Sequence, residues 1–197
     1  MQQSKRQIMA QQKYQAIIKA ATKLFAEKGF HGTTVPEVAK QAGIGAGTIY
    51  LYFQNKEDLV NGVFQESKSK LKLYLARDIK IDQSQDLQQA FNVAWQNLCD
   101  FASENPQDFC FLELHEHSKY LNRESKRIEI SILAPLRMII LQGKKQSKIK
   151  PLPAITLIAM IWGVFVGLFK ANLHGYAKLN QSTLTSARDM CWDMISP

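Results

Sequence analysis

Cysteine is scarce in this chain: its 197 residues include three cysteines, and these form no pattern of ligands or pairs. Cys99, Cys110 and Cys191 are odd in number, and each lies among apolar neighbours. Such a set predicts reduced thiols in a hydrophobic core, and it argues against a disulfide-stabilised secreted domain and a cysteine-based metal site. The N-terminus also lacks the charged-then-apolar pattern of an export signal, so we expect a cytoplasmic protein.

Sequence signatures of catalysis are missing as well. No Ser/His/Asp or Cys/His order stands out, and no glycine-rich loop has the spacing of a nucleotide-phosphate cradle. We therefore expect neither an enzyme nor a bound cofactor.

Strand-like alternation is absent past Ile79, where apolar residues recur at helical spacing, so an all-α fold is predicted.

Acidic residues are outnumbered, with 17 Asp and Glu against 25 Lys and Arg, a net charge of +8. Residues 1–56 hold eight of the basic residues and two glutamates, a net charge of +6. Such an excess suits DNA, which releases counterions when basic groups approach, although a basic protein without an anionic partner has the same composition. Lys5 and Arg6 fit two interpretations, a flexible DNA-contacting arm or a solvated, disordered start.

What the sequence does have is a dense set of helix signals between residues 34 and 59, TVPEVAKQAGIGAGTIYLYFQNKEDL. Thr34 and Glu37 have the spacing of a capping box, and the helix they begin ends at Gly43, which allows the positive φ of a turn. One apolar stripe follows from the spacing of Val35, Val38, Ala39 and Ala42.

A second short helix is predicted from about Ala46 to Phe53, and Asn55 with Asp58 begins a third. Small residues at the start of the second helix allow a close approach to another surface, and the helix dipole there favours an anion such as phosphate. The segment therefore predicts a DNA-binding helix-turn-helix. The alternative is a helical hairpin that only packs.

This pattern, T-V-x-x-V-A-x-x-A-G-I-x-x-G-T-I-Y-x-Y-F-x-N-K-E-D-L, resembles the DNA-binding half of the TetR family of bacterial repressors. A predicted amphipathic helix from Met9 to Lys28, ending in AEKGFHGTT, precedes it as in that family. The resemblance implies an all-helical homodimer, with an N-terminal three-helix DNA-binding domain and a C-terminal domain that binds a small molecule and dimerises. On this division, residues 1–56 bind DNA, residues 57–197 bind ligand and dimerise, and a helix from about 56 to 79 connects them.

Eight positions match DNA-facing positions of that family. The threonines resemble contacts to phosphates or base edges, the small residues mark where the recognition helix enters the major groove, and the tyrosines and the lysine face DNA. These positions are Thr34, Gly45, Ala46, Gly47, Thr48, Tyr50, Tyr52 and Lys56. One departure is that the family often has Ser or Thr near Gly45, so backbone amides must replace a capping hydroxyl here.

Further helices are predicted over about residues 87–104 and 107–120, and from Asn122 through a kink at Pro135. Pockets between helices are mostly apolar, so large side chains on these helices are candidates for a ligand site. The candidate lining is Phe91, Trp95, Leu112, Ile132, Trp162 and Phe165. The alternative for each of them is ordinary core packing.

Glu113 and His117 fall one turn apart on the predicted 107–120 helix, and this spacing has three interpretations. The pair could contact a polar ligand, bind a metal ion, or lie on a solvated surface. We include both residues among the candidate ligand contacts and predict no metal site.

Residues 151–169 carry no charge over 19 positions, long enough for a membrane span. Lys150 and Lys170 flank the run, and a row of small residues at four-residue spacing would also let two helices pack closely. This row is Ala159, Gly163, Gly167 and Ala171. In the family that the chain resembles, the last two helices form the dimer interface. We therefore predict no membrane span, and a four-helix bundle formed by helices 153–176 and 183–195 of two copies.

Together these features predict a ligand-responsive transcriptional regulator. It is expected to be a repressor that leaves a near-palindromic double-stranded operator when an unidentified small molecule binds. The alternatives are a DNA-binding protein without sequence preference and a membrane-anchored regulator.

Overall fold

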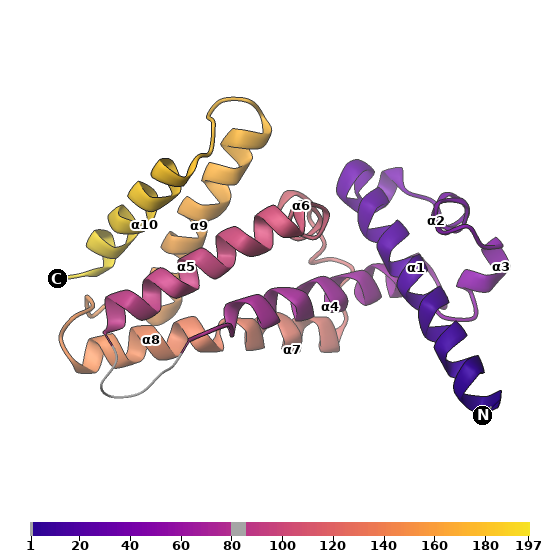
Figure 1. The fold of residues 1–197 in the computed structure, drawn as a ribbon, viewed down its shortest axis with the longest axis horizontal. Coiled ribbons are helices and arrows are strands. Elements are labelled where there is room, and N and C mark those ends of the chain that lie inside the picture. Colours follow the sequence, from indigo (N-terminus) through magenta and orange to yellow (C-terminus); the bar gives the residue numbers. More distant parts are fainter. Residues whose placement is uncertain (1, 80–85) are drawn as a thin grey trace. The chain divides into compact units, whose positions relative to one another are not determined.

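The computed structural model describes residues 2–79 and 86–197, and every regular element within them is an α-helix (Figure 1). The predicted all-α fold is confirmed. The helices are α1 (Gln2–Gly32), α2 (Val35–Ala42), α3 (Ala46–Ile49), α4 (Lys56–Leu75), α5 (Leu87–Glu104), α6 (Pro106–Leu114), α7 (Arg123–Ile132), α8 (Ala134–Lys145), α9 (Ala154–Leu173) and α10 (Gln181–Ile195).

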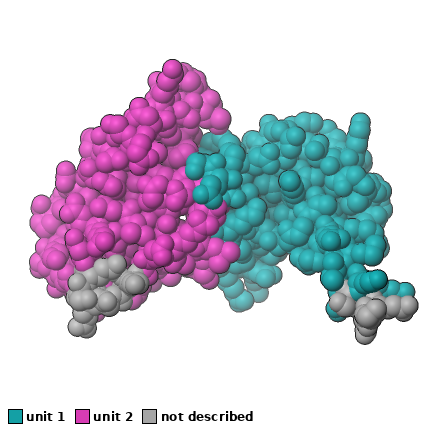
Figure 2. Space-filling view, in the orientation of Figure 1, with its two compact units in different colours: residues 1–70, 102–129 teal, residues 71–101, 130–197 magenta. Residues whose placement is uncertain are grey.

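Contacts divide the chain into two compact units (Figure 2). Unit 1 holds residues 1–70 and 102–129, and unit 2 holds residues 71–101 and 130–197. Unit 1 thus combines the predicted DNA-binding segment with α6 and most of α7, which come much later in the sequence.

α1 is longer than the predicted helix and includes Lys5 and Arg6, so neither of the two interpretations, a flexible arm or a disordered start, agrees with the structure. A break occurs at Gly29, whose φ of 66° is outside the helical range. The buried face of α1, which includes Ile17, Ala21 and Phe25, packs on α2 and α6.

α2 begins as predicted. The Thr34 hydroxyl accepts a hydrogen bond from the Glu37 amide, the Glu37 carboxylate accepts one from the Thr34 amide, and Gly43 ends the helix at φ 70°. α3 is shorter than expected, since it ends at Ile49 and not at Phe53. The chain continues in tight turns, in which the amides of Leu51 and Tyr52 bond three residues back.

α4 also begins as predicted. Asn55 Oδ1 accepts from the Asp58 amide, and the Asp58 carboxylate accepts from the Gln54 amide. The helix ends at Leu75, four residues before the expected Ile79, and turns follow it.

Two later predictions need correction. α6 begins at Pro106, one residue before its predicted start, and ends at Leu114, because His115 is extended and its Nε2 donates to the Ala26 carbonyl at 2.8 Å. Glu113 and His117 therefore do not share a helix face. The predicted kink at Pro135 is a full break at Leu133, with the proline in the first turn of α8, where a missing amide costs no helical bond.

Unit 2 is built on a core of α5, α8, α9 and α10. Within it, α9 packs against α8 and α10. The three cysteines are unpaired, with Cys99 and Cys191 buried and Cys110 half-buried. Burial raises the pKa of Cys99 to about 12 and that of Cys191 to about 11.

Candidate nucleic-acid interface

The turn and short helix between Gly45 and Leu51 form an exposed tip on unit 1. Ile49 anchors this tip, since it is 1% exposed, whereas Tyr50 is 56% exposed and Leu51 is 82% exposed. A Cβ atom added at Gly47 would meet no atom within 4 Å. α3 has Gly45 as its N-cap and no side-chain cap, as expected from the missing hydroxyl, so its first amides are open to a partner.

Thr34 and Tyr52 are less available than the other predicted contacts. Both donors of Thr34, its amide and its hydroxyl, are directed at Glu37 Oε2 at 2.8 Å. Hydrogen bonds from Lys28 and then from Thr34 lower the pKa of Glu37 to about 2, so this acceptor stays ionised. Tyr52 is half-buried, and its hydroxyl donates to the Ala10 carbonyl at 3.2 Å.

Lys56 lies at the start of α4, after the turns that follow the tip, and is half-buried. Its ammonium lies 4.2 Å from the centroid of the Phe30 ring. Phe30 in turn stacks on Tyr120 with 3.9 Å between ring centroids, and the Tyr120 hydroxyl is 2.9 Å from His31 Nε2. Sequence reasoning missed these contacts, since nothing near Tyr120 predicts a partner in α1.

The segment between α6 and α7 is tied to α4 through one buried residue, Asn61. Asn61 Nδ2 donates to the Tyr120 carbonyl at 2.7 Å, and its Oδ1 accepts from the Asn122 amide at 2.8 Å and from the Ser125 hydroxyl at 2.7 Å. The side chain therefore satisfies two groups of that segment and one of α7 at once, which fixes the segment against the helix that carries Lys56.

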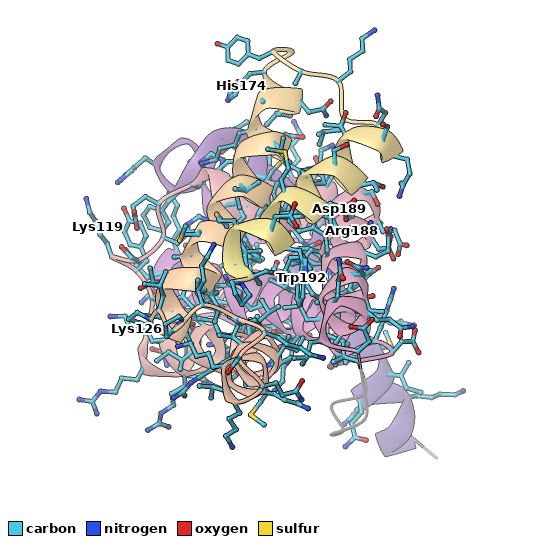
Figure 3. All side chains as sticks on the ribbon, turned by 90° about the vertical axis from the view of Figure 1, so that its left-hand side faces the viewer. Lys119, Lys126, His174, Arg188, Asp189 and Trp192 are labelled. Carbon is cyan, nitrogen blue, oxygen red and sulfur yellow. The ribbon has the colours of Figure 1, made fainter. Side chains whose placement is uncertain are left out.

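The predicted ligand-binding residues are divided between the two units. Phe91, Trp95, Ile132, Trp162 and Phe165 lie in unit 2, where the ring centroid of Phe165 is 5.6 Å from Trp95 and 6.0 Å from Trp162. Trp192 of α10, labelled in Figure 3, extends this cluster, with 5.5 Å between its ring centroid and that of Phe91. Two buried atoms on one face of α5, Asn92 Oδ1 and Trp95 Nε1, have no hydrogen-bond partner within the described residues.

The other three ligand-binding candidates, Leu112, Glu113 and His117, lie in unit 1. The His117 ring is buried, stacks on Phe111 and donates from Nε2 to the Phe111 carbonyl at 2.6 Å. Lys68, which sequence reasoning missed, is buried nearby and lies 4.0 Å from a carboxylate oxygen of Glu113. Across residues 2–79 and 86–197, no cluster of three His, Cys, Asp or Glu side chains could hold a metal ion.

Family models match both parts of this chain. Residues 17–63 match the bacterial regulatory proteins of the tetR family, and residues 64–197 match the tetracyclin repressor-like C-terminal domain. The chain belongs to the TetR family. It is therefore a DNA-binding transcriptional regulator with an N-terminal helix-turn-helix domain and a helical C-terminal domain.

Individual relatives agree with this TetR assignment. An uncharacterised regulator of Bacillus subtilis, YhgD, is 31% identical over 148 residues, which cover 74% of this chain and 76% of the relative. The fatty acid metabolism regulator protein of the same organism is 47% identical over 68 residues, which cover 34% of this chain and 35% of the relative. The match thus spans about a third of that curated relative, and about half of another from Haemophilus influenzae.

Solved TetR structures have the same fold over nearly the whole chain. A regulator from Marinobacter aquaeolei has a TM-score of 0.83 at 25% identity, and the match covers 100% of this chain and 99% of that one. The regulator FadR of Bacillus subtilis, in complex with stearoyl-CoA, has a TM-score of 0.71 at 25% identity, covering 92% and 96%.

Proposed function

We propose that this TetR-family protein is a repressor that binds a near-palindromic operator as a homodimer and leaves it when a small molecule binds. The exposed tip at Gly45 to Leu51 carries the proposal, because a large aromatic side chain and open glycines on a helix-turn-helix need a partner. The basic charge of residues 1–56 adds a sequence-independent attraction to DNA.

We assign sequence recognition mainly to the open end of the tip. Gly45, Ala46 and Gly47 permit close approach to the duplex, and Thr48 and Tyr50 would contact bases or phosphates. Lys56 would contact a phosphate. Thr34 and Tyr52 would act mainly by fixing α2 and the turn after α3, because their hydroxyl groups already bond within the protein.

Dimerisation through α9 and α10 is supported by the face that α9 leaves open. Its most apolar stretch is only 28% buried, although the helix is long and apolar enough to cross a membrane. A Cβ atom at Gly163 or Gly167 would meet no atom within 4 Å. A second copy would cover this face and allow close helix packing.

Ligand binding is supported by two buried polar atoms beside the aromatic cluster of unit 2 that lack hydrogen-bond partners within the described residues. A buried donor at Trp95 and a buried acceptor at Asn92 are costly without partners, and a ligand with one polar group and an apolar body would satisfy both. Stearoyl-CoA is the first compound to test, because it is bound to the FadR relative.

Such a ligand would lower DNA affinity only by the difference between its affinities for the two conformations of the repressor. A compound that binds both conformations equally would leave the operator occupied. Release by ligand is therefore a stricter test than ligand binding alone.

Selection from random duplexes with the purified full-length chain tests the DNA-binding part. We expect a near-palindromic site, and weakening of binding to that site by about tenfold or more in Tyr50→Ala. Leu73→Ala removes another exposed side chain, on α4, and serves as the control. Selection without a preferred sequence would favour the nonspecific alternative, and a protein that sediments with membranes would favour the anchored one.

A further inference from the structure

We propose that Tyr120, in the segment between α6 and α7, is a positioning residue for DNA binding that holds Lys56 in place through the Phe30 ring. The proposal rests on the proposed contact between Lys56 and a phosphate. It joins two parts of the chain that are 64 positions apart in sequence and lie together in unit 1.

The three side chains form a continuous stack. The Lys56 ammonium lies 4.2 Å from the Phe30 centroid, and Tyr120 stacks on the same ring with 3.9 Å between centroids and an interplanar angle of 19°. A cation is attracted to the electron-rich face of an aromatic ring, so the ring gives the flexible lysine a preferred position.

Within the part of the chain that the structure describes, no carboxylate fixes this lysine. Lys56 forms no ion pair within residues 2–79 and 86–197, although Glu57 and Asp58 follow it directly. Among the described residues, the Phe30 ring is thus the group that gives the ammonium a defined neighbour. Without it, the four-carbon stem would sample more rotamers and lose more freedom on contact with a phosphate.

Tyr120 is itself fixed at both ends. Its hydroxyl bonds to His31 Nε2, and its carbonyl accepts from the buried Asn61. The segment that carries it is also held at His115, which donates to the Ala26 carbonyl. These bonds hold the tyrosine ring against Phe30, and the stacked ring in turn supports Phe30 in its contact with Lys56.

A double-mutant cycle on the selected operator tests the inference. We expect Tyr120→Ala to weaken operator binding by about two- to fivefold, the range of an exposed cation–π contact. It should also reduce the dependence of affinity on salt, by less than the decrease of about one caused by Lys56→Ala. In the Lys56→Ala background, Tyr120→Ala should have no further effect.

Two variants keep the test valid if Tyr120→Ala folds poorly. Tyr120→Phe keeps the stacked ring and loses only the bond to His31, so it should bind almost as the unmodified chain does. Phe30→Leu keeps an apolar side chain but removes the aromatic face, and it should reproduce the Tyr120→Ala effect on the salt dependence. Lys119→Ala is the control, because this exposed lysine lies in the same segment and its side chain extends outward from the ribbon (Figure 3).

The outcomes separate the two proposals. If Lys56→Ala leaves operator affinity and salt dependence unchanged, the proposed phosphate contact fails. If Lys56→Ala weakens binding but Tyr120→Ala costs the same affinity with and without Lys56, the positioning role is overturned. Equal effects of Lys119→Ala and Tyr120→Ala on the salt dependence would overturn it as well.

Discussion

His117 is a buried ring with one satisfied and one unsatisfied nitrogen. Nε2 donates to the Phe111 carbonyl, whereas Nδ1 has no partner within the described residues. Burial lowers the pKa of His117, and the nearby His115 and Lys68 act in the same direction, against the Phe111 carbonyl and Glu116. The folded protein therefore holds this histidine in its neutral form.

The lowered pKa predicts a loss of stability in mild acid. Because the unfolded chain takes up this proton more readily, the stabilisation is present above about pH 6.5 and is lost as the pH falls through the lower folded value. His117→Gln keeps a donor for Phe111 but cannot titrate, so its free energy of unfolding should fall less below about pH 6.5 than that of the unmodified chain. Urea unfolding on both sides of this pH measures the difference.

His174→Gln is the matched control, since this exposed histidine lies at the end of α9 (Figure 3). It removes one histidine and leaves the buried ring in place. If both glutamine variants change the pH dependence by the same amount, burial of His117 is not the cause.

At the scale of single helices, the glycines of α9 and α4 have opposite surroundings. The Gly163 position is open, whereas a Cβ atom at Gly62 would lie 2.6 Å from the Phe53 ring. Gly163→Leu should therefore leave the fold of the single chain intact but weaken dimerisation, because the added side chain would keep two α9 helices apart. Sedimentation velocity over a range of concentrations measures this effect.

The control for this prediction is Gly163→Ala. In a helix interior the smaller substitution is expected to stabilise the chain by about 1 kcal/mol, and it adds little bulk to the face. Gly62→Ala, by contrast, should destabilise the chain, because the Phe53 ring must move. Unchanged self-association of Gly163→Leu would argue against α9 as the dimer helix.

Helix starts were predicted from the sequence better than helix ends. The starts of α2 and α4 depend on local signals, namely Thr34 with Glu37 and Asn55 with Asp58, whereas α6 begins one residue before its predicted start. The end of α6 depends on a bond from His115 to Ala26, 89 positions away, and no local pattern encodes that contact. α3 ends early because tight turns replace its last predicted turn.

At the scale of the whole molecule, the candidate site also has a part that local sequence predicts and a part that depends on contacts between distant segments. The tip is continuous in sequence, so its residues could be named from one segment. The stack of Tyr120, Phe30 and Lys56 could not, because three separate segments form it. Phe91, Trp95, Trp162 and Phe165 of the unit 2 cluster were named from the sequence only as candidate pocket lining, and that role stays a prediction. Trp192 and the buried Oδ1 of Asn92 were missed, since neither lies in a distinctive pattern.

If two copies dimerise through α9 and α10, the spacing between the two half-sites of the operator is fixed. Two recognition helices related by a two-fold axis would read half-sites about one turn of DNA apart, roughly 34 to 36 Å. Insertion of half a turn, about five base pairs, between the half-sites would place them on opposite faces of the duplex. Binding to this altered site should fall to the nonspecific level, and insertion of a full turn should restore part of it only if the dimer is deformable. Gel-shift titrations with the three duplexes measure this, and equal affinity for all of them would mean that single chains, and not a two-fold dimer, recognise the DNA.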